Sequence, residues 1–143
     1  MPYEFLDDIA TADVAFMASG QTQEEMFRAA ADAFLNVMLP DIEKLEPEVT
    51  QTIHVQADDM EMLLFQYLQE LIFLKDAGKL LLRVNRVDIQ DQSNKFILEA
   101  QASGEPIDPD RHDLSVDIKA VTLHRFGIRQ TNDGWEATVV LDI

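Results

Sequence analysis

Hydrophobic residues recur at helical spacing in two stretches of the chain. The first stretch follows Thr22 and Glu25, whose three-residue spacing is typical of a capping box at a helix N-terminus, and we expect its helix to end before Pro40. Its apolar positions are Met26, Phe27, Ala30, Ala33, Phe34, Val37 and Met38. The second stretch follows Asp58, which we expect to be the N-cap, and ends at Gly78. Its apolar positions are Met60, Leu63, Leu64, Tyr67, Leu68, Leu71 and Ile72.

Elsewhere the hydrophobic period is two, which predicts strands. Alternating stretches lie at 13–20, 49–57, 80–90, 96–102, 116–128 and 135–143. The alternation changes phase near Asn85 and Arg86, which predicts a β-bulge there. Two helices and about six strands without an internal linker predict a single domain over residues 1–143. The expected fold is a two-layer α+β domain, with a largely antiparallel sheet and the two helices on one face.

Charge narrows the possible functions. Eleven Lys and Arg against 27 Asp and Glu give a net charge of −16. A protein that binds nucleic acid needs a basic surface to displace counterions from the phosphates, so we expect no direct nucleic-acid binding. An acidic surface suits cation binding or docking on a basic partner, although it is also explained by solubility alone.

The chain shows no sign of export or of a membrane-bound location. It contains no cysteine, which removes disulfides and thiolate chemistry and suits a reducing compartment. No apolar run approaches the roughly 20 residues of a membrane-spanning helix, and the first residues lack the features of a signal peptide. We therefore expect a cytoplasmic protein.

The usual motifs of catalysis are missing. The five glycines are scattered, so no phosphate-binding loop is present. The stretch 108–119 begins with alternating aspartates, but Asp113 and Lys119 occupy the positions where a calcium-binding EF-hand loop needs glycine and glutamate. The three histidines are far apart and form no zinc motif. The sequence therefore does not predict a conventional enzyme.

Two predicted strands end in aspartates. Asp13 begins the first strand, and Asp142 precedes the terminal Ile143. If these strands pair, the two aspartates and the α-carboxylate of Ile143 converge, and such a group favours a hard divalent cation. The alternative is a pair of solvated strand-end residues, and the spacing alone favours that alternative.

A second stretch of interest, 104–124, contains a loop with Pro106 and Pro109 followed by Lys119 and His124. A rigid loop of mixed charge suits a docking surface. Equally, Lys119 could be an ordinary surface lysine and His124 a partly buried histidine with satisfied hydrogen bonds.

The chain resembles the archease family from end to end. The resemblance rests on "TADV", "EEMFRAAADAF", "YLQELIFLKD", "GEPIDPDRHDLSVDIKAVTLH" and "WEATVVLDI". It implies an α+β protein that is not itself an enzyme. The implied function is activation of an RtcB-type RNA ligase in tRNA splicing and RNA repair, through faster guanylylation and multiple turnover. It also implies a divalent cation, expected to be calcium, bound by Asp13, Asp142 and the carboxylate of Ile143.

The chain departs from the family pattern in places. Ala10 stands where many relatives have histidine, so no role of that histidine is carried over. Gln66 and Gln69 stand where many relatives have an acidic or amide residue, which leaves the partner surface open. Asp41 matches an aspartate of many relatives and is a candidate for the partner surface or for the surroundings of the cation.

Two other functions remain open at this point. One is a chaperone or modulator of RNA-modifying proteins without a metal-dependent role. The other is a metal-dependent hydrolase that uses the carboxylates, for which the sequence supplies neither a nucleophile nor a base.

Overall fold

The computed structural model describes residues 2–6, 13–114 and 116–143. The strands are β1 (Tyr3–Leu6), β2 (Asp13–Gly20), β3 (Val49–Ala57), β4 (Leu80–Gln92), β5 (Lys95–Pro106), β6 (Ala120–Thr131) and β7 (Gly134–Asp142). The helices are α1 (Gln23–Met38), α2 (Met60–Asp76) and the short 3-10 helix η1 (Ile42–Lys44).

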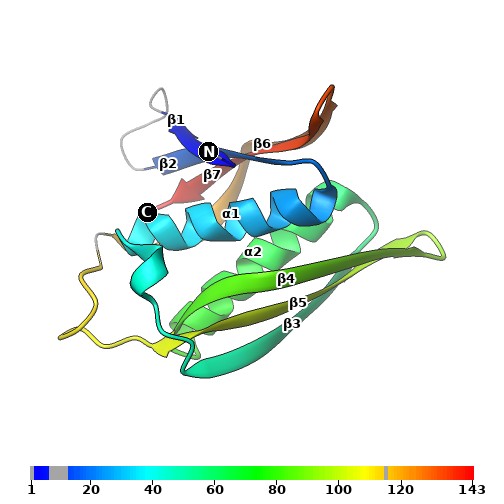
Figure 1. The fold of residues 1–143 in the computed structure, drawn as a ribbon. Helices are drawn as coiled ribbons and strands as arrows, with labels where there is room; N and C mark the ends of the chain where they lie inside the picture. The colour runs from blue at the N-terminus through cyan, green and yellow to red at the C-terminus, as the bar shows by residue number, and fades with distance from the viewer. Residues whose placement is uncertain (1, 7–12, 115) are drawn as a thin grey trace.

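The strands form two antiparallel sheets, and the two long helices lie between them (Figure 1). The four-stranded sheet has the order β1-β2-β7-β6, and the three-stranded sheet has the order β3-β5-β4. Helix α1 packs against β2 on one side and β4 on the other, while α2 packs against β6 and β3. Both helices therefore contact both sheets.

The α+β class, the two helices and the antiparallel strands agree with the sequence prediction. The arrangement differs from the predicted single sheet, because the seven strands of the described residues are divided between two sheets and the helices have a sheet on each side. Ten of the 16 residues of α1 are buried, including Ala29, Ala31 and Leu35, which lie outside the predicted apolar stripe. A helix that is buried on more than one face needs a second covering layer.

The core is one connected cluster of buried side chains from both sheets and both helices. Tyr67 of α2 links the helices, because its hydroxyl donates to the carbonyl of Phe27 at 3.1 Å and the two rings lie 5.4 Å apart. Burial raises the pKa of Tyr67, so this hydroxyl keeps its proton and remains a donor. None of the described helices is long and apolar enough to cross a membrane.

Local sequence signals predicted the start of α1 and the bulge of β4, and they placed the start of α2 to within one residue. The capping box is present, with the Glu25 N–H donating to Thr22 Oγ1 at 3.1 Å and the Thr22 N–H donating to Glu25 Oε2 at 3.3 Å. The β-bulge of β4 lies between Val84 and Arg86 as predicted. The N-cap of α2 is Asp59 rather than the predicted Asp58, because the Asp59 carboxylate accepts from the N–H of Met62.

Three strands differ from the expectation. Strand β5 runs to Pro106, four residues beyond the predicted end at Ala102, because its last residues continue the pairing with β4. The four-residue β1 was not predicted, since alternation over so few residues is not distinctive. Strand β6 begins at Ala120 rather than near residue 116. Its register against β7 also breaks between Thr122 and Gly127, where Arg125 has a φ of 54°.

Candidate functional site

The pairing of β2 with β7 brings the two predicted aspartates together. The strands run antiparallel in register from Gly20 opposite Trp135 to Asp13 opposite Asp142. This register is set by apolar alternation, because one face of each strand contributes to the helix-facing core. The core residues on that face are Val14, Phe16 and Ala18 of β2 and Ala137, Val139 and Leu141 of β7.

Asp13 and Asp142 therefore lie on the opposite face of the sheet, which points away from the helices. Residues directly opposite in antiparallel strands have Cβ atoms about 4.5–5.5 Å apart. Both aspartates are half-buried, and on the other side of Asp142 the strand β6 presents only the short side chain of Ala120. Two like charges in this position repel each other and destabilise the strand pair unless a cation neutralises them.

The donors present suit a hard cation. Both side chains offer carboxylate oxygens, and within the described ranges no Lys, Arg or His lies within ion-pair distance of either one. Among the described residues, no three or more His, Cys, Asp or Glu side chains are grouped so that they could hold a metal ion. A cation bound by these two carboxylates would need further oxygen ligands. Ala10 and Thr11 of the N-terminal motif lie outside the described residues.

Lys119 lies beside this pair in the sheet. Its backbone N–H donates to the carbonyl of Asp142 at 2.8 Å, and its side chain is exposed. His124 is also exposed, not partly buried as one of the alternatives proposed, and it lies within the register break of β6 between Thr122 and Gly127. The structure therefore puts Lys119 next to the strand-end aspartates and separates His124 from the core.

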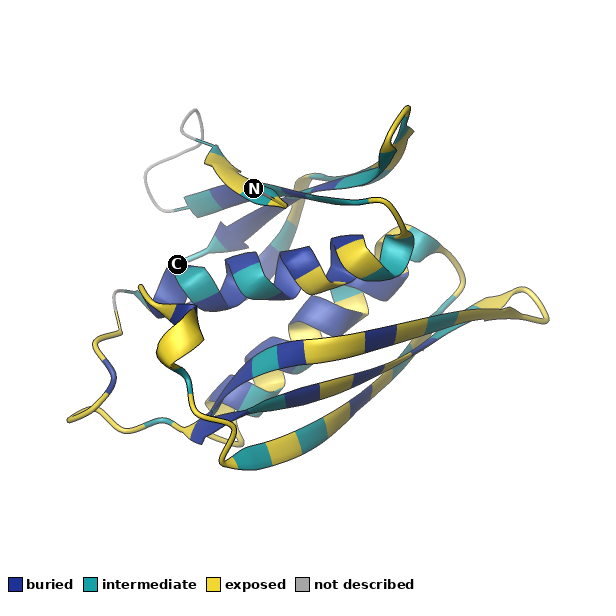
Figure 2. Ribbon diagram, viewed as in Figure 1, coloured by how far each residue is buried: buried dark blue, intermediate teal, exposed yellow. Residues whose placement is uncertain are grey.

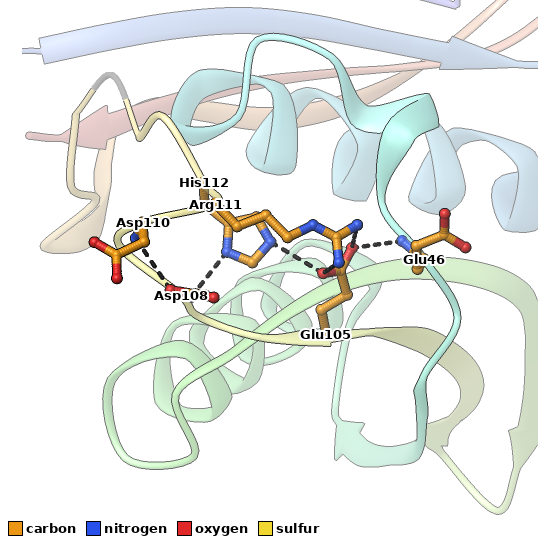
Figure 3. Close-up of polar contacts among 6 residues, drawn as sticks. All are labelled: Glu46, Glu105, Asp108, Asp110, Arg111 and His112. Carbon is orange, nitrogen blue, oxygen red and sulfur yellow. Dashed lines mark hydrogen bonds and ion pairs between the residues drawn. The ribbon is translucent and has the colours of Figure 1, made fainter.

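A second polar cluster centres on the buried carboxylate of Glu105, at the end of β5 (Figure 3). Glu105 is 2% exposed and accepts from the N–H of Glu46 at 2.6 Å. Arg111 pairs with both of its oxygens, at 2.9 and 3.1 Å, and His112 Nε2 lies 3.2 Å from Oε1. The hydrogen bond from Glu46 is the largest of the influences that lower the pKa of Glu105, followed in the same direction by Arg111 and His112, whereas burial opposes them.

The same cluster fixes the loop that follows β5. His112 Nδ1 accepts the N–H of Asp108 at 2.9 Å, so its proton is on Nε2 and is donated to Glu105. The N–H groups of Arg111 and His112 donate to the backbone carbonyl of Asp108. The N–H of Asp110 donates to the Asp108 carboxylate (Figure 3). Both nitrogens of His112 are therefore in use for structure, which leaves neither free for a metal.

A groove of about 360 Å³ lies between this loop and the connector after α1. Arg111 and His112 line one side of it, and Asp41 lies on the other. Asp41 is also the N-cap of η1, since its carboxylate accepts from the N–H of Glu43 at 3.3 Å. The contacts of Asp41 therefore belong to this groove and to η1.

Lys75 of α2 forms an ion pair with Asp117, at the end of the segment between β5 and β6. It is 4% exposed and pairs with Asp76 and, at 2.7 Å, with Asp117. Burial alone lowers the pKa of Lys75, but hydrogen bonds to Asp117 and Asp76 outweigh burial, and the net pKa is raised. Sequence reasoning did not identify Glu105, Arg111, His112 or Lys75 as partners, because no pattern along the chain marks a polar residue as buried and paired.

Comparisons with known proteins give a consistent family. The model of the Archease protein family matches residues 3–143. The chain is 39% identical to the archease of Methanosarcina barkeri over 142 residues, covering 99% of this chain and 95% of that protein. It is 37% identical to the archease of Pyrococcus furiosus over 134 residues, covering 93% and 94%.

The fold supports the same family assignment. The solution structure of Methanobacterium thermoautotrophicum protein 1598 matches with a TM-score of 0.87 and 32% identity, covering 99% of both chains. Sequence and fold agree over nearly the whole length, and the chain belongs to the archease family.

Proposed function

We propose that this protein is an accessory factor that binds a divalent cation and activates an RtcB-type RNA ligase in tRNA splicing and RNA repair. The observation that carries the proposal is the position of Asp13 opposite Asp142 in a chain of the archease family. The proposed cation ligands are Asp13, Asp142 and the α-carboxylate of Ile143, and calcium is the expected ion.

Strand pairing would place the proposed ligands before the cation binds. Pairing of β2 with β7 holds the two carboxylates close, so an arriving cation meets a site already formed and also removes a like-charge repulsion. The backbone bond from Lys119 to Asp142 fixes the third strand beside them. A bound divalent cation would supply positive charge, which attracts the phosphates of a nucleotide or RNA held by the ligase.

The charge of the chain supports an accessory role rather than independent RNA binding. With a net charge of −16 the protein repels RNA, whereas a ligase needs a basic RNA-binding surface to which an acidic protein is attracted. The proposal therefore includes no catalytic residue in this chain and no direct contact with RNA without the ligase.

A multiple-turnover ligation assay with limiting cognate ligase tests the proposal. Wild type, Asp142→Asn and the control Asp133→Asn would be compared. Asp133 is an exposed aspartate in the β6–β7 turn at the other end of the same sheet, so its replacement makes the same change of charge away from the site. We expect stimulation by wild type and Asp133→Asn and none by Asp142→Asn.

The other outcomes separate the alternatives. Equal stimulation by all three proteins would retain the ligase role and remove the metal-dependent part of the proposal. No stimulation by wild type would contradict the proposal as a whole and favour a modulator of other RNA-modifying proteins.

A further inference from the structure

One side of the molecule consists of α2 between two edge strands, one from each sheet. Strand β6 is an edge of the four-stranded sheet, and β3 is an edge of the three-stranded sheet. Both strands pack against α2, while α1 lies over the opposite part of each sheet (Figure 1). Edge strands carry unpaired backbone groups, and proteins usually cover or disrupt them.

The edge of β6 is covered by α2. The carboxylate of Glu61 accepts from the N–H of Ile128 at 2.9 Å, and the amide oxygen of Gln69 accepts from the N–H of Val121 at 3.4 Å. The register of β6 also breaks between these two points. Side chains and a bulge therefore prevent another strand from pairing there.

The edge of β3 has no comparable protection. Its nine residues, VTQTIHVQA, include no Asp, Glu, Lys, Arg or Pro. All nine pair with β5 on one side. Apart from this pairing, the only hydrogen bond to its backbone in the part of the chain that the structure describes is from the Gln51 side chain to the carbonyl of Thr52, at 3.4 Å. A long, uncharged and unpaired edge is a template for strand addition.

The surface beside this edge is partly apolar. Exposed residues alternate with less exposed ones along β3 (Figure 2). Only Ile53 is fully buried among the residues of β3 that face the helices, whereas Val49 and Val55 remain partly exposed. Helix α2, which packs against β3, has an exposed face that we call the α2 shelf and define as Met62, Gln66 and Phe73. Met62 and Phe73 are 37% and 59% exposed.

The α2 shelf and the end of β3 meet at a hollow of about 360 Å³. Gln56 and Ala57 of β3 line it together with Met62 and Gln66 of the shelf. Its charged lining residues are Asp58, Asp59 and Lys95, so the hollow has a net negative charge. A strand added to β3 would place alternate side chains over this hollow and the shelf, and would point the others toward solvent.

We propose that β3 and the α2 shelf form a docking site for an extended segment of a partner protein, bound by strand addition. The segment would have apolar residues at alternate positions, facing the shelf. It would carry basic residues at its ends, because Glu48 lies at one end of β3 and Asp58 and Asp59 lie at the other. The site is on the three-stranded sheet and is therefore separate from the strand-end aspartates.

A second copy of the chain fits this edge less well. Each copy carries a net charge of −16, so two copies repel each other. Antiparallel pairing of two β3 strands centred on Ile53 would also place Glu48 of one copy opposite Asp58 of the other, and like charges in that position destabilise a strand pair. A basic partner segment removes both penalties.

Titration of the full-length protein with a synthetic peptide tests the proposal. The peptide has a core of alternating valine and threonine as long as β3, with two lysines at each end. One control peptide has alternate backbone amides methylated, which blocks strand pairing, and another has glutamate in place of lysine. We expect NMR shifts and slower amide exchange along β3 and at the α2 shelf, about tenfold weaker binding with glutamate ends, and no binding of the methylated peptide.

Matched variants of β3 sharpen the test. Gln51→Lys puts a charge on the face that the added strand would bury, whereas Thr52→Lys puts the same charge on the exposed face. We expect about a tenfold loss of affinity from the first and less than about threefold from the second. Met62→Lys, on the exposed shelf, provides a second variant if Gln51→Lys does not fold.

Four results would overturn the proposal. They are equal binding of the methylated peptide, shifts confined to other surfaces, no binding of the lysine peptide, and a wild-type dimer that Gln51→Lys dissociates. The last result would assign the edge to a second copy of the chain.

Discussion

The cluster around Glu105 makes a quantitative prediction about stability. Replacing Glu105 with glutamine keeps the shape of the side chain but removes the charge and turns one accepting oxygen into a donating NH₂ group. The oxygens of Glu105 accept from Glu46, Arg111 and His112, and the carboxylate is 2% exposed. The glutamine NH₂ group would therefore face at least one donor that has lost its acceptor.

The size of the effect follows from these contacts. Removal of one partner of a buried ion pair costs about 3–5 kcal/mol, but the side chain of Arg111 is 47% exposed and can be rehydrated, so we expect about 2–4 kcal/mol. At about 2.1 cal/mol/K of unfolding entropy per residue, a chain of this length loses roughly 3 °C in Tm for each kcal/mol. Glu105→Gln should therefore lower Tm by about 7–13 °C at pH 7.

The pH dependence identifies the charge as the cause. Glu105 has a pKa below its ordinary 4.5, so its contribution to stability is fully present above about 4.5 and is lost as pH falls through the lower pKa of the folded state. The difference between wild type and Glu105→Gln should shrink over that acidic range.

Urea unfolding at several pH values measures this difference, with Glu99→Gln as the control. Glu99 lies on the same strand and is exposed, so its replacement should change stability by less than about 0.5 kcal/mol. A Glu105→Gln effect as small as the control, or one that does not change at acidic pH, would refute the reasoning.

Two further predictions concern α2. Asp59→Ala should lower the free energy of unfolding by about 1 kcal/mol, because the N-cap is lost, and Asp58→Ala should lower it much less. Chemical denaturation measures both variants, and equal losses would contradict the assignment of the cap. Lys75→Met should cost about 1–2 kcal/mol, because Asp76 and Asp117 are largely exposed and can be rehydrated. Lys79→Met serves as the control, since Lys79 is an exposed lysine in the turn between α2 and β4. Thermal unfolding at pH 7 measures both lysine variants, and equal stability of the two would argue against the buried ion pairs.

Predictions from the sequence were accurate where a signal is local. The capping box of Thr22 and Glu25 and the bulge near Asn85 depend on neighbouring residues, and both are present. The neighbouring Asp58 and Asp59 are equivalent as sequence signals, and only the hydrogen bond to Met62 distinguishes them.

The sequence did not predict features that depend on contacts between residues far apart in the chain. Alternation identifies strands but does not say to which sheet they belong, so the division into two sheets was missed. Whether Asp13 and Asp142 lie together depends on the pairing of two strands that are 129 positions apart, and no local sequence pattern indicates such a pairing. The structure pairs these strands, with Asp13 opposite Asp142. Glu105 and His112 are residue types that are mostly exposed or intermediate, so their burial followed from no rule of composition.

The effect of a divalent cation on thermal stability is the most direct test of the proposed cation site. Thermal unfolding would be followed with increasing calcium for wild type, for Asp142→Asn and for a chain extended beyond Ile143 by a short glycine-serine tail. A chain with the same tail at its N-terminus is the control for the extension.

We expect calcium at about 100 times its Kd to stabilise wild type and the N-terminally extended chain by about 2.7 kcal/mol. Asp142→Asn and the C-terminally extended chain should not respond. If all four proteins respond equally, or none responds, the strand-end carboxylates do not form the proposed cation site.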